Sequence, residues 1–212
     1  MTLKVKVCGV KSITHVKACI KGKAKMIGLM FYNKSPRFIN LKTAKKISNF
    51  AKKKIKRVGV IANLNIEEIK EITENVELDY LQFHGNETTD FLRNIKKILK
   101  IKIIKALQIS NKNSIKKISN FKKVSDYILL DTKIIKKHLN LKKSKELNWN
   151  LIKKIKNKDS LILSGALNIN NLKKATKETN FDFVDVSSGL ETVSGEKSIK
   201  KIDKFLQLAT KL

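Results

Sequence analysis

The chain has 212 residues, a mass of 24.2 kDa and a net charge of +29, from 47 basic and 18 acidic side chains. A hydrophobic content of 42% supports a sizeable core and excludes a wholly disordered chain. Its two cysteines exclude a disulfide scaffold and its apolar runs are too short to span a bilayer, so we expect a cytoplasmic protein rather than a secreted or integral membrane protein.

Eight short segments rich in Val, Ile and Leu recur along the chain, and most of them do not alternate with polar residues. Such runs are typical of parallel strands that are buried on both faces. The predicted strands are residues 5–8, 27–31, 58–62, 80–83, 101–106, 127–130, 161–163 and 183–186.

Amphipathic segments lie between these strands and predict helices. The predicted helices include residues 41–54, 66–74, 87–100, 114–121, 147–156, 169–177 and 197–212. Asn65 or Asn63 is a candidate N-cap for the helix at 66–74, with Glu67 and Glu68 complementing the dipole of its first turn. Helical spacing makes Cys19 a packing residue.

Strands that alternate with helices predict an α/β fold with a parallel sheet. Eight such units fit a single (β/α)8 TIM barrel with eight parallel strands, and an open doubly wound sheet is the alternative. Four glycines favour the barrel because they fall at or just past the ends of strands, where a ligand approaches the backbone: Gly9, Gly85, Gly165 and Gly189. Since no linker or composition break divides the chain, we expect residues 1–212 to form one catalytic barrel domain.

The basic residues extend along the whole chain, although no acid precedes Glu67. Many lysines lie between apolar residues at helical spacing, as at Lys42, Lys45 and Lys46. This pattern indicates solvated outer faces of helices. A nucleic-acid-binding surface, the alternative interpretation of the charge, would concentrate basic side chains and interleave aromatic ones.

The active site of a (β/α)8 barrel is built at the C-terminal ends of its strands. The candidate residues at or after these ends are Cys8, Arg37, Asn63, Gln82, His84, Asp131, Ser164, Gly165, Ser187, Ser188 and Gly189. Each also has an ordinary structural interpretation, such as a small core residue for Cys8 or a turn residue for Asp131. The Ser-Gly pairs follow the last two strands, where this fold commonly holds a phosphate. None of the candidates has the spacing of a metal site, so no metal is expected.

A series of short motifs covers these strands and the turns that follow them. The motifs are residues 6–10, 31–39, 58–60 with Asn63, 81–87, 104–106, 129–131, 163–168 and 185–191. In order and spacing they resemble the phosphoribosylanthranilate isomerase family, the barrel enzymes of tryptophan biosynthesis. The chain departs from the family where Ala166 replaces a usual second glycine and where residues 136–145 lack the family's glycines.

The resemblance implies an Amadori rearrangement of N-(5-phosphoribosyl)anthranilate to 1-(2-carboxyphenylamino)-1-deoxyribulose 5-phosphate, the third step of tryptophan biosynthesis from chorismate. It implies that Asp131 is the general acid and Cys8 the general base, with Arg37 paired to the anthranilate carboxylate. The further substrate-binding residues that it implies are Gln82, His84 and Asn63. The phosphate-binding residues that it implies are Ser164, Gly165, Ala166, Ser187, Ser188 and Gly189.

We expect a small phosphorylated substrate as the ligand and no specific nucleic acid, membrane or cofactor. A monomer is expected, with a homodimer as the alternative. The main functional alternative is another phosphosugar-handling barrel enzyme. An epimerase of that kind would need metal-binding residues that His15, His84 and His138 do not supply. A third alternative, a decayed enzyme, is disfavoured by the intact Cys8, Asp131 and Arg37.

Overall fold

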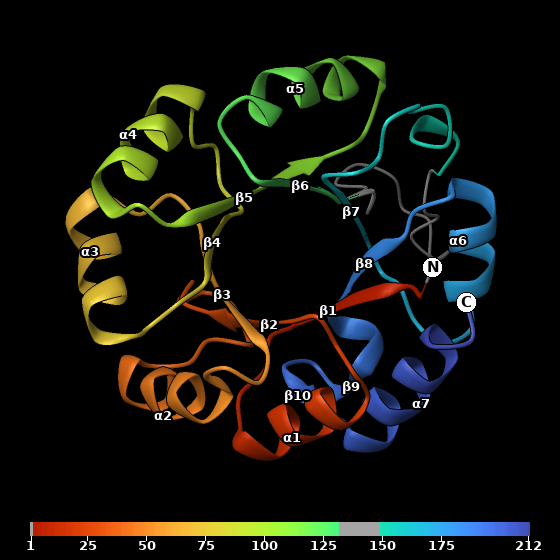
Figure 1. The fold of residues 1–212 in the computed structure, drawn as a ribbon, viewed down its shortest axis with the longest axis horizontal. Helices are drawn as coiled ribbons and strands as arrows, with labels where there is room; N and C mark the ends of the chain where they lie inside the picture. Colours follow the sequence, from red (N-terminus) through yellow and green to blue (C-terminus); the bar gives the residue numbers. More distant parts are fainter. Residues whose placement is uncertain (1, 132–148) are drawn as a thin grey trace, which may run out of the picture.

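Eight parallel strands form a closed barrel in the computed structural model, which describes residues 2–131 and 149–212. Each strand pairs with the next one along the chain, and β1 pairs with β8 to close the ring (Figure 1). The strands are β1 (Lys4–Cys8), β2 (Met26–Met30), β3 (Lys56–Ile61), β4 (Tyr80–Phe83), β5 (Lys102–Gln108), β6 (Tyr127–Asp131), β7 (Leu161–Ser164) and β8 (Phe183–Val186). The predicted (β/α)8 barrel is confirmed, and the closed ring excludes the open sheet.

An outer ring of helices surrounds the strands (Figure 1). The helices are α1 (Ile13–Lys21), α2 (Leu41–Ala51), α3 (Ile66–Asn75), α4 (Thr89–Leu99), α5 (Lys112–Lys122), α6 (Leu172–Thr179) and α7 (Ile199–Ala209). Asn65, not Asn63, caps α3, and it forms a capping box with Glu68 that satisfies two backbone N–H groups. No helix among the described residues combines the length and apolar content that a membrane span needs.

The predicted helix at 147–156 is wrong over its described residues. Trp149–Leu151 form a 3-10 turn, η1, and the residues after it continue as turns and bends. Trp149 and Ile152 are both buried, and their three-residue spacing suits the 3-10 repeat. The expectations for residues 136–145, Leu147 and His138 lie outside the described residues.

The segment after β8 holds short elements that the sequence did not predict. A 3-10 helix, η2 (Ser188–Leu190), is followed by an antiparallel pair of strands, β9 (Glu191–Val193) and β10 (Glu196–Lys197). The helix predicted at 197–212 is confirmed, with observed bounds of Ile199–Ala209. Helix α7 begins only after this hairpin, where the Ser198 side chain accepts a hydrogen bond from the N–H of Lys201. Gly195, with a φ of 90°, makes the turn between β9 and β10.

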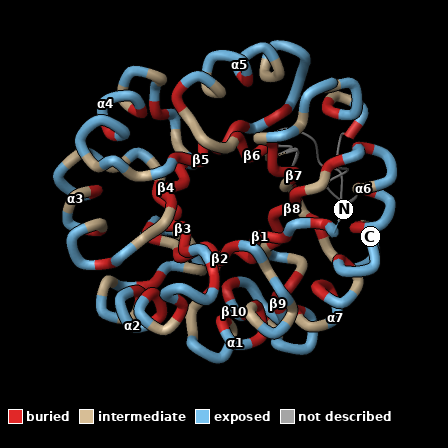
Figure 2. Tube along the Cα trace, viewed as in Figure 1, coloured by how far each residue is buried: buried red, intermediate tan, exposed pale blue. Residues whose placement is uncertain are grey.

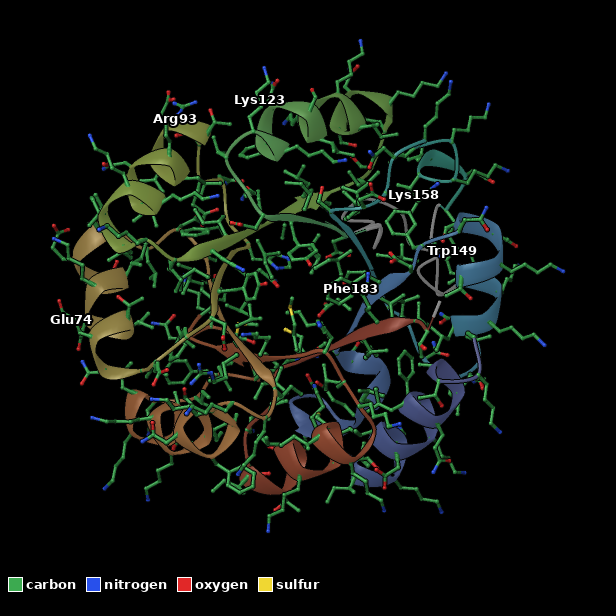
Figure 3. The ribbon with its side chains drawn as sticks, in the orientation of Figure 1. Glu74, Arg93, Lys123, Trp149, Lys158 and Phe183 are labelled. Atoms are coloured by element: carbon green, nitrogen blue, oxygen red, sulfur yellow. The ribbon has the colours of Figure 1, made fainter. Side chains whose placement is uncertain are left out.

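Two layers of apolar side chains form the core, one inside the barrel and one between the strands and the helices. Figure 2 shows buried residues along the strands and exposed residues on the outer sides of the helices. Charged residues such as Arg93 and Lys123 lie at the periphery of the molecule (Figure 3). Lys42, Lys45 and Lys46 of α2 are exposed while Ala44 and Ile47 are buried, so the predicted solvated helix faces are confirmed there.

Candidate active site at the C-terminal rim of the barrel

Parallel strands bring their C-terminal ends to one rim, and this rim collects the residues expected at the site. Cys8 is the last residue of β1 and Asp131 the last residue of β6. Gln82 lies in β4, and His84 directly follows that strand. Ser164 ends β7. The barrel therefore joins residues that are far apart in the sequence.

The Cys8 side chain is buried in the interior cluster of the barrel, beside Met26 and Val58. Gly28 on β2 makes room for it, because a Cβ at Gly28 would lie 2.9 Å from the Cys8 sulfur. Burial raises the pKa of the Cys8 thiol, while the positive charges of Lys6 and Lys197 oppose that rise. The thiol thus lies among apolar side chains, and the charges of two ammonium groups act on it.

His84 and Asp131 lie next to each other on the opposite part of the rim. The His84 Nε2 and an Asp131 carboxylate oxygen are 3.9 Å apart, and the Gln82 amide nitrogen is 3.2 Å from His84 Nδ1. Burial lowers the pKa of His84, and the Asp131 carboxylate opposes this shift. At neutral pH the imidazole is therefore uncharged, and a cavity of about 740 Å³ borders both side chains.

Arg37 reaches the rim from the loop after β2. Its Nε and Nη2 donate hydrogen bonds of 2.7 Å each to the two carboxylate oxygens of Glu191. Gly9 lets the arginine stem pass over the end of β1, because a Cβ there would lie 2.6 Å from the Arg37 Cδ. The guanidinium group is held by two parallel hydrogen bonds, the arrangement that fixes its direction best.

Glu191, at the start of β9, is the centre of this charged group. The Lys197 ammonium donates to it at 2.5 Å, and the N–H of Gly195 donates at 3.2 Å. Burial opposes ionisation of Glu191, but the hydrogen bonds from Arg37 and Lys197 outweigh burial and lower its pKa to about 2. Glu191 is therefore a carboxylate throughout the physiological range.

The loops after β7 and β8 pack against each other. A Cβ at Gly189 would lie 2.0 Å from the carbonyl oxygen of Leu167, so only glycine fits at this contact. Ser187 donates a hydrogen bond of 3.0 Å to the carbonyl of Cys8, which ties the β8 loop to the end of β1. Gly165 and Ala166 both have a positive φ, 108° and 51°. The Ser-Gly segments thus form one continuous edge of the rim beside Cys8.

Asn63 is also at the rim, but its hydrogen bonds are with the neighbouring loop. Its N–H donates to Glu87 at 2.8 Å, and its side-chain oxygen accepts from the N–H of Asn86 at 2.8 Å. Its φ of 54° is one that asparagine tolerates. Asn63 therefore connects the loops after β3 and β4.

Sequence reasoning missed four residues that organise this rim: Lys6, Gly28, Glu191 and Lys197. Lys6 carries a detectable signal, because it lies two residues before Cys8 in a strand and therefore shares its face. The other three carry no such signal, since their partners are fixed by contacts between distant segments. Arg37 and Glu191, for example, are 154 residues apart in the chain.

Comparisons with known proteins find relatives in sequence and in fold. The family model described as N-(5'phosphoribosyl)anthranilate (PRA) isomerase matches residues 5–208. The N-(5'-phosphoribosyl)anthranilate isomerase of Rhizobium johnstonii is 32% identical over 208 residues, which cover 98% of this chain and 94% of the relative. The crystal structure of phosphoribosyl anthranilate isomerase from Thermotoga maritima is 32% identical with a TM-score of 0.87, over 99% of this chain and 100% of that one. Another crystal structure of a phosphoribosyl anthranilate isomerase, bound to reduced 1-(o-carboxyphenylamino)-1-deoxyribulose 5-phosphate, is 31% identical with a TM-score of 0.84 over the same shares.

Proposed function

The chain belongs to the N-(5'-phosphoribosyl)anthranilate isomerase family, and from this membership we infer how its rim residues perform the reaction. The enzyme converts N-(5-phosphoribosyl)anthranilate to 1-(2-carboxyphenylamino)-1-deoxyribulose 5-phosphate, an Amadori rearrangement in tryptophan biosynthesis. The observation that carries the assignment of roles is the placement of a thiol and a carboxyl group on one rim, at the ends of β1 and β6.

The first step opens the sugar ring, and we assign its acid to Asp131. A proton from the Asp131 carboxyl group goes to the furanose ring oxygen as the C1–O bond breaks. The anthranilate nitrogen supplies its lone pair to C1, which gives a protonated Schiff base. The Asp131 side chain is 24% exposed, so it can exchange its proton with solvent between turnovers.

The second step removes the proton from C2, and we assign the base to Cys8. The Cys8 thiolate takes this proton, the C–H electron pair forms a C1–C2 double bond, and the iminium electrons return to nitrogen. The resulting enolamine becomes the ketone when the C2 hydroxyl proton leaves and C1 gains a proton. The imine nitrogen is the electron sink, so these steps invoke no cofactor. Acid–base roles of this kind each contribute about 10²- to 10⁴-fold in rate.

Arg37 is proposed to bind the anthranilate carboxylate. Glu191 takes Nε and one hydrogen of Nη2, so the guanidinium group still offers the Nη1 hydrogens and the second Nη2 hydrogen. Those donors form a fork that matches a carboxylate. His84 and Gln82 lie beside Asp131 and are proposed to contact the sugar. Asn63 is proposed to bind substrate as well, from the loop after β3, where its N–H is held by Glu87 of the neighbouring loop.

The phosphate is proposed to bind the edge formed by the loops after β7 and β8. Its proposed ligands are the backbone and hydroxyl groups of Ser164, Gly165, Ala166, Ser187, Ser188 and Gly189. The close packing of Gly189 on Leu167 supports this site, because it fixes the two loops as one unit. Barrels of this class commonly hold phosphate at this part of the rim.

Residues 1–212 are proposed to act as one catalytic domain in the cytoplasm, where the free thiols of Cys8 and Cys19 would persist. A monomer is proposed, because a net charge of +29 opposes self-association, and a homodimer is the alternative. Light scattering of the purified protein distinguishes a mass near 24.2 kDa from twice that value.

The activity is tested by adding purified protein to fluorescent phosphoribosylanthranilate. We expect the fluorescence to fall as substrate is consumed and the carboxyphenylaminodeoxyribulose phosphate to accumulate in equal amount. Spontaneous substrate hydrolysis would instead release anthranilate, so quantifying anthranilate separates the two processes. Substrate loss no faster than in buffer alone would refute the assignment.

A further inference from the structure

A buried ion pair lies in the barrel interior directly below Cys8. Lys6 is two residues before Cys8 on β1, so the two side chains share the inner face of the strand. The Lys6 side chain is 0% exposed, and its ammonium nitrogen is 2.7 Å from Oδ1 of Asp185. Lys6 and Asp185 are also direct register partners in the pairing of β1 with β8.

Both carboxylate oxygens of Asp185 are used. Oδ1 accepts from Lys6, and Oδ2 accepts a 3.1 Å hydrogen bond from the hydroxyl of Ser164 on β7. Three adjacent strands, β7, β8 and β1, thus contribute to one hydrogen-bonded row. The Lys6 ammonium therefore has little freedom to move away from the end of β1.

Packing alone does not explain a charged pair at this depth. Other inward positions of the same barrel hold apolar side chains, such as Met26, Ile162 and Phe183. Replacing a buried ion pair by apolar residues is often neutral or stabilising, because the two charges lose their hydration. A lysine kept at this position therefore calls for a role besides stability.

We propose that Lys6 is a positioning residue for proton abstraction: its ammonium group, fixed by Asp185, lies against Cys8 and stabilises the thiolate that acts as the base. The inference rests on the proposed role of Cys8 and extends it to the residue that makes the base available. Lys6 acts through Cys8 and need not touch the substrate.

The charges around Cys8 support this role. Burial raises the pKa of the thiol, and Lys6 opposes the rise both by its charge and by a hydrogen bond to the sulfur. Asp185 on β8 acts in the other direction, but less strongly than the charge of Lys6, and Lys197 on β10 adds to the effect of Lys6. His84 follows β4 and Asp131 ends β6, and each of these strands is three strands away from β1 in the ring. Lys6 therefore exerts the largest favourable effect on the thiolate.

The test is an ultraviolet titration of the Cys8 thiolate without substrate, in a Cys19→Ala background that leaves a single thiol. Lys6→Met should raise the pH midpoint of Cys8 ionisation by about 1–3 pH units, the usual effect of losing an adjacent opposite charge. The acid limb of the pH profile of kcat/KM should move upward by the same amount. A folded Lys6→Met protein that titrates like its parent would overturn the inference.

Lys105→Met is the matched control. Lys105 is also buried and is bonded to Glu87 at 2.8 Å, but it lies on β5, away from the row that β7, β8 and β1 form below Cys8. Its loss should leave the thiolate midpoint in place, and an equal shift in both variants would also overturn the inference. Because the titration needs no turnover, a wild-type protein without isomerase activity would refute the proposed function separately.

Two further measurements cover the case in which Lys6→Met does not fold. The double variant Lys6→Met/Asp185→Asn leaves neither charge of the pair without its partner. Its Cys8 titration midpoint should still rise, because the charge of Lys6 affects the thiol pKa more strongly than the charge of Asp185 does. In the unaltered protein, the nitrogen NMR signal of the buried Lys6 ammonium should shift at the pH where the thiolate forms. A Lys6 signal that does not respond to that titration would contradict the inference.

Discussion

At the scale of single residues, Arg37 is proposed to bind the substrate by the geometry of its donors as well as by its positive charge. Its guanidinium group is fixed by Glu191 and keeps donors for a second carboxylate. Arg37→Lys preserves the charge but offers a point donor in place of a fork. We expect kcat/KM to fall by an amount equivalent to about 1.5–3 kcal/mol, the usual contribution of one charge-assisted hydrogen bond.

The comparison variant for this prediction is Arg37→Met, which removes the charge as well. Its kcat/KM should be lower still, because no donor remains for the carboxylate. Steady-state kinetics on both variants measure the two effects. If both retained values close to the wild type, Arg37 would not belong to the site.

Ala166 gives a second prediction at this scale, about stability. Its φ of 51° lies in the left-handed region, where a Cβ costs about 1–2 kcal/mol. Ala166→Gly removes that cost but adds backbone entropy to the unfolded chain, worth about 0.5–1 kcal/mol. The free energy of unfolding should therefore rise slightly, as measured by urea denaturation, and Ala24→Gly, at an ordinary φ, should lower it. A clear loss of stability in Ala166→Gly would contradict the argument.

Single residues also mark the limit of what sequence could predict about the site. Cys8, Asp131 and Ser164 could be predicted because parallel strands of a barrel end on one rim. The partners Asp185 and Glu191 could not, because their contacts depend on which strands and loops are neighbours in space. Lys6 and Asp185 are 179 residues apart in the chain and meet only because the barrel closes.

At the scale of elements, the hairpin of β9 and β10 is joined to the rest of the rim by Glu191. Its pKa of about 2 lies below the ordinary value of 4.5, so Glu191 binds a proton less readily in the folded protein. The Glu191 carboxylate therefore stabilises the folded protein fully at pH values above its ordinary pKa of 4.5. This contribution is lost as the pH falls through about 2.

Glu191→Gln tests this linkage. The wild type should be more stable than the variant at neutral pH, and the difference should narrow as the pH falls from about 5 toward 2. Free energies of unfolding measured by denaturant across that range give the comparison. A difference that stays constant with pH would show that the charge of Glu191 does not stabilise the fold.

Elements also differ in how well the sequence predicted them. The eight strands were predictable because their apolar runs are buried on both faces, and their observed ends differ by only a few residues. The η1 turn and the β9–β10 hairpin were not, since each is too short for a periodic pattern. In both segments, contacts with distant parts of the chain outweigh the local preference for a secondary structure. Trp149 is buried in the core, and Glu191 binds Arg37.

At the scale of the whole molecule, the net charge of +29 should affect the rate at which substrate binds rather than the rate at which bound substrate reacts. The substrate carries a phosphate and a carboxylate, so a positive field raises its association rate. The Debye length falls from about 30 Å at 0.01 M salt to about 8 Å at 0.15 M. We therefore expect kcat/KM to fall with rising salt while kcat changes little.

The same salt series separates an enzyme from a nucleic-acid-binding protein. Weak DNA binding is expected of any protein this basic, with a Kd of about 10⁻⁴ to 10⁻⁶ M at physiological salt. DNA binding far tighter than this range, together with no turnover in the same buffer, would support the nucleic-acid alternative. A kcat that changes as steeply as kcat/KM would contradict the steering argument.

Asp131 and Cys8 are proposed to supply the acid and the base for one rearrangement, and kcat/KM toward phosphoribosylanthranilate tests these roles most directly in three variants. Cys8→Ser and Asp131→Asn should each lose about 10²-fold or more while remaining folded. Cys19→Ala, a matched change at the buried thiol of α1, should keep activity near the wild type. A Cys8 or Asp131 variant that kept more than about a tenth of wild-type activity would contradict the role assigned to that residue.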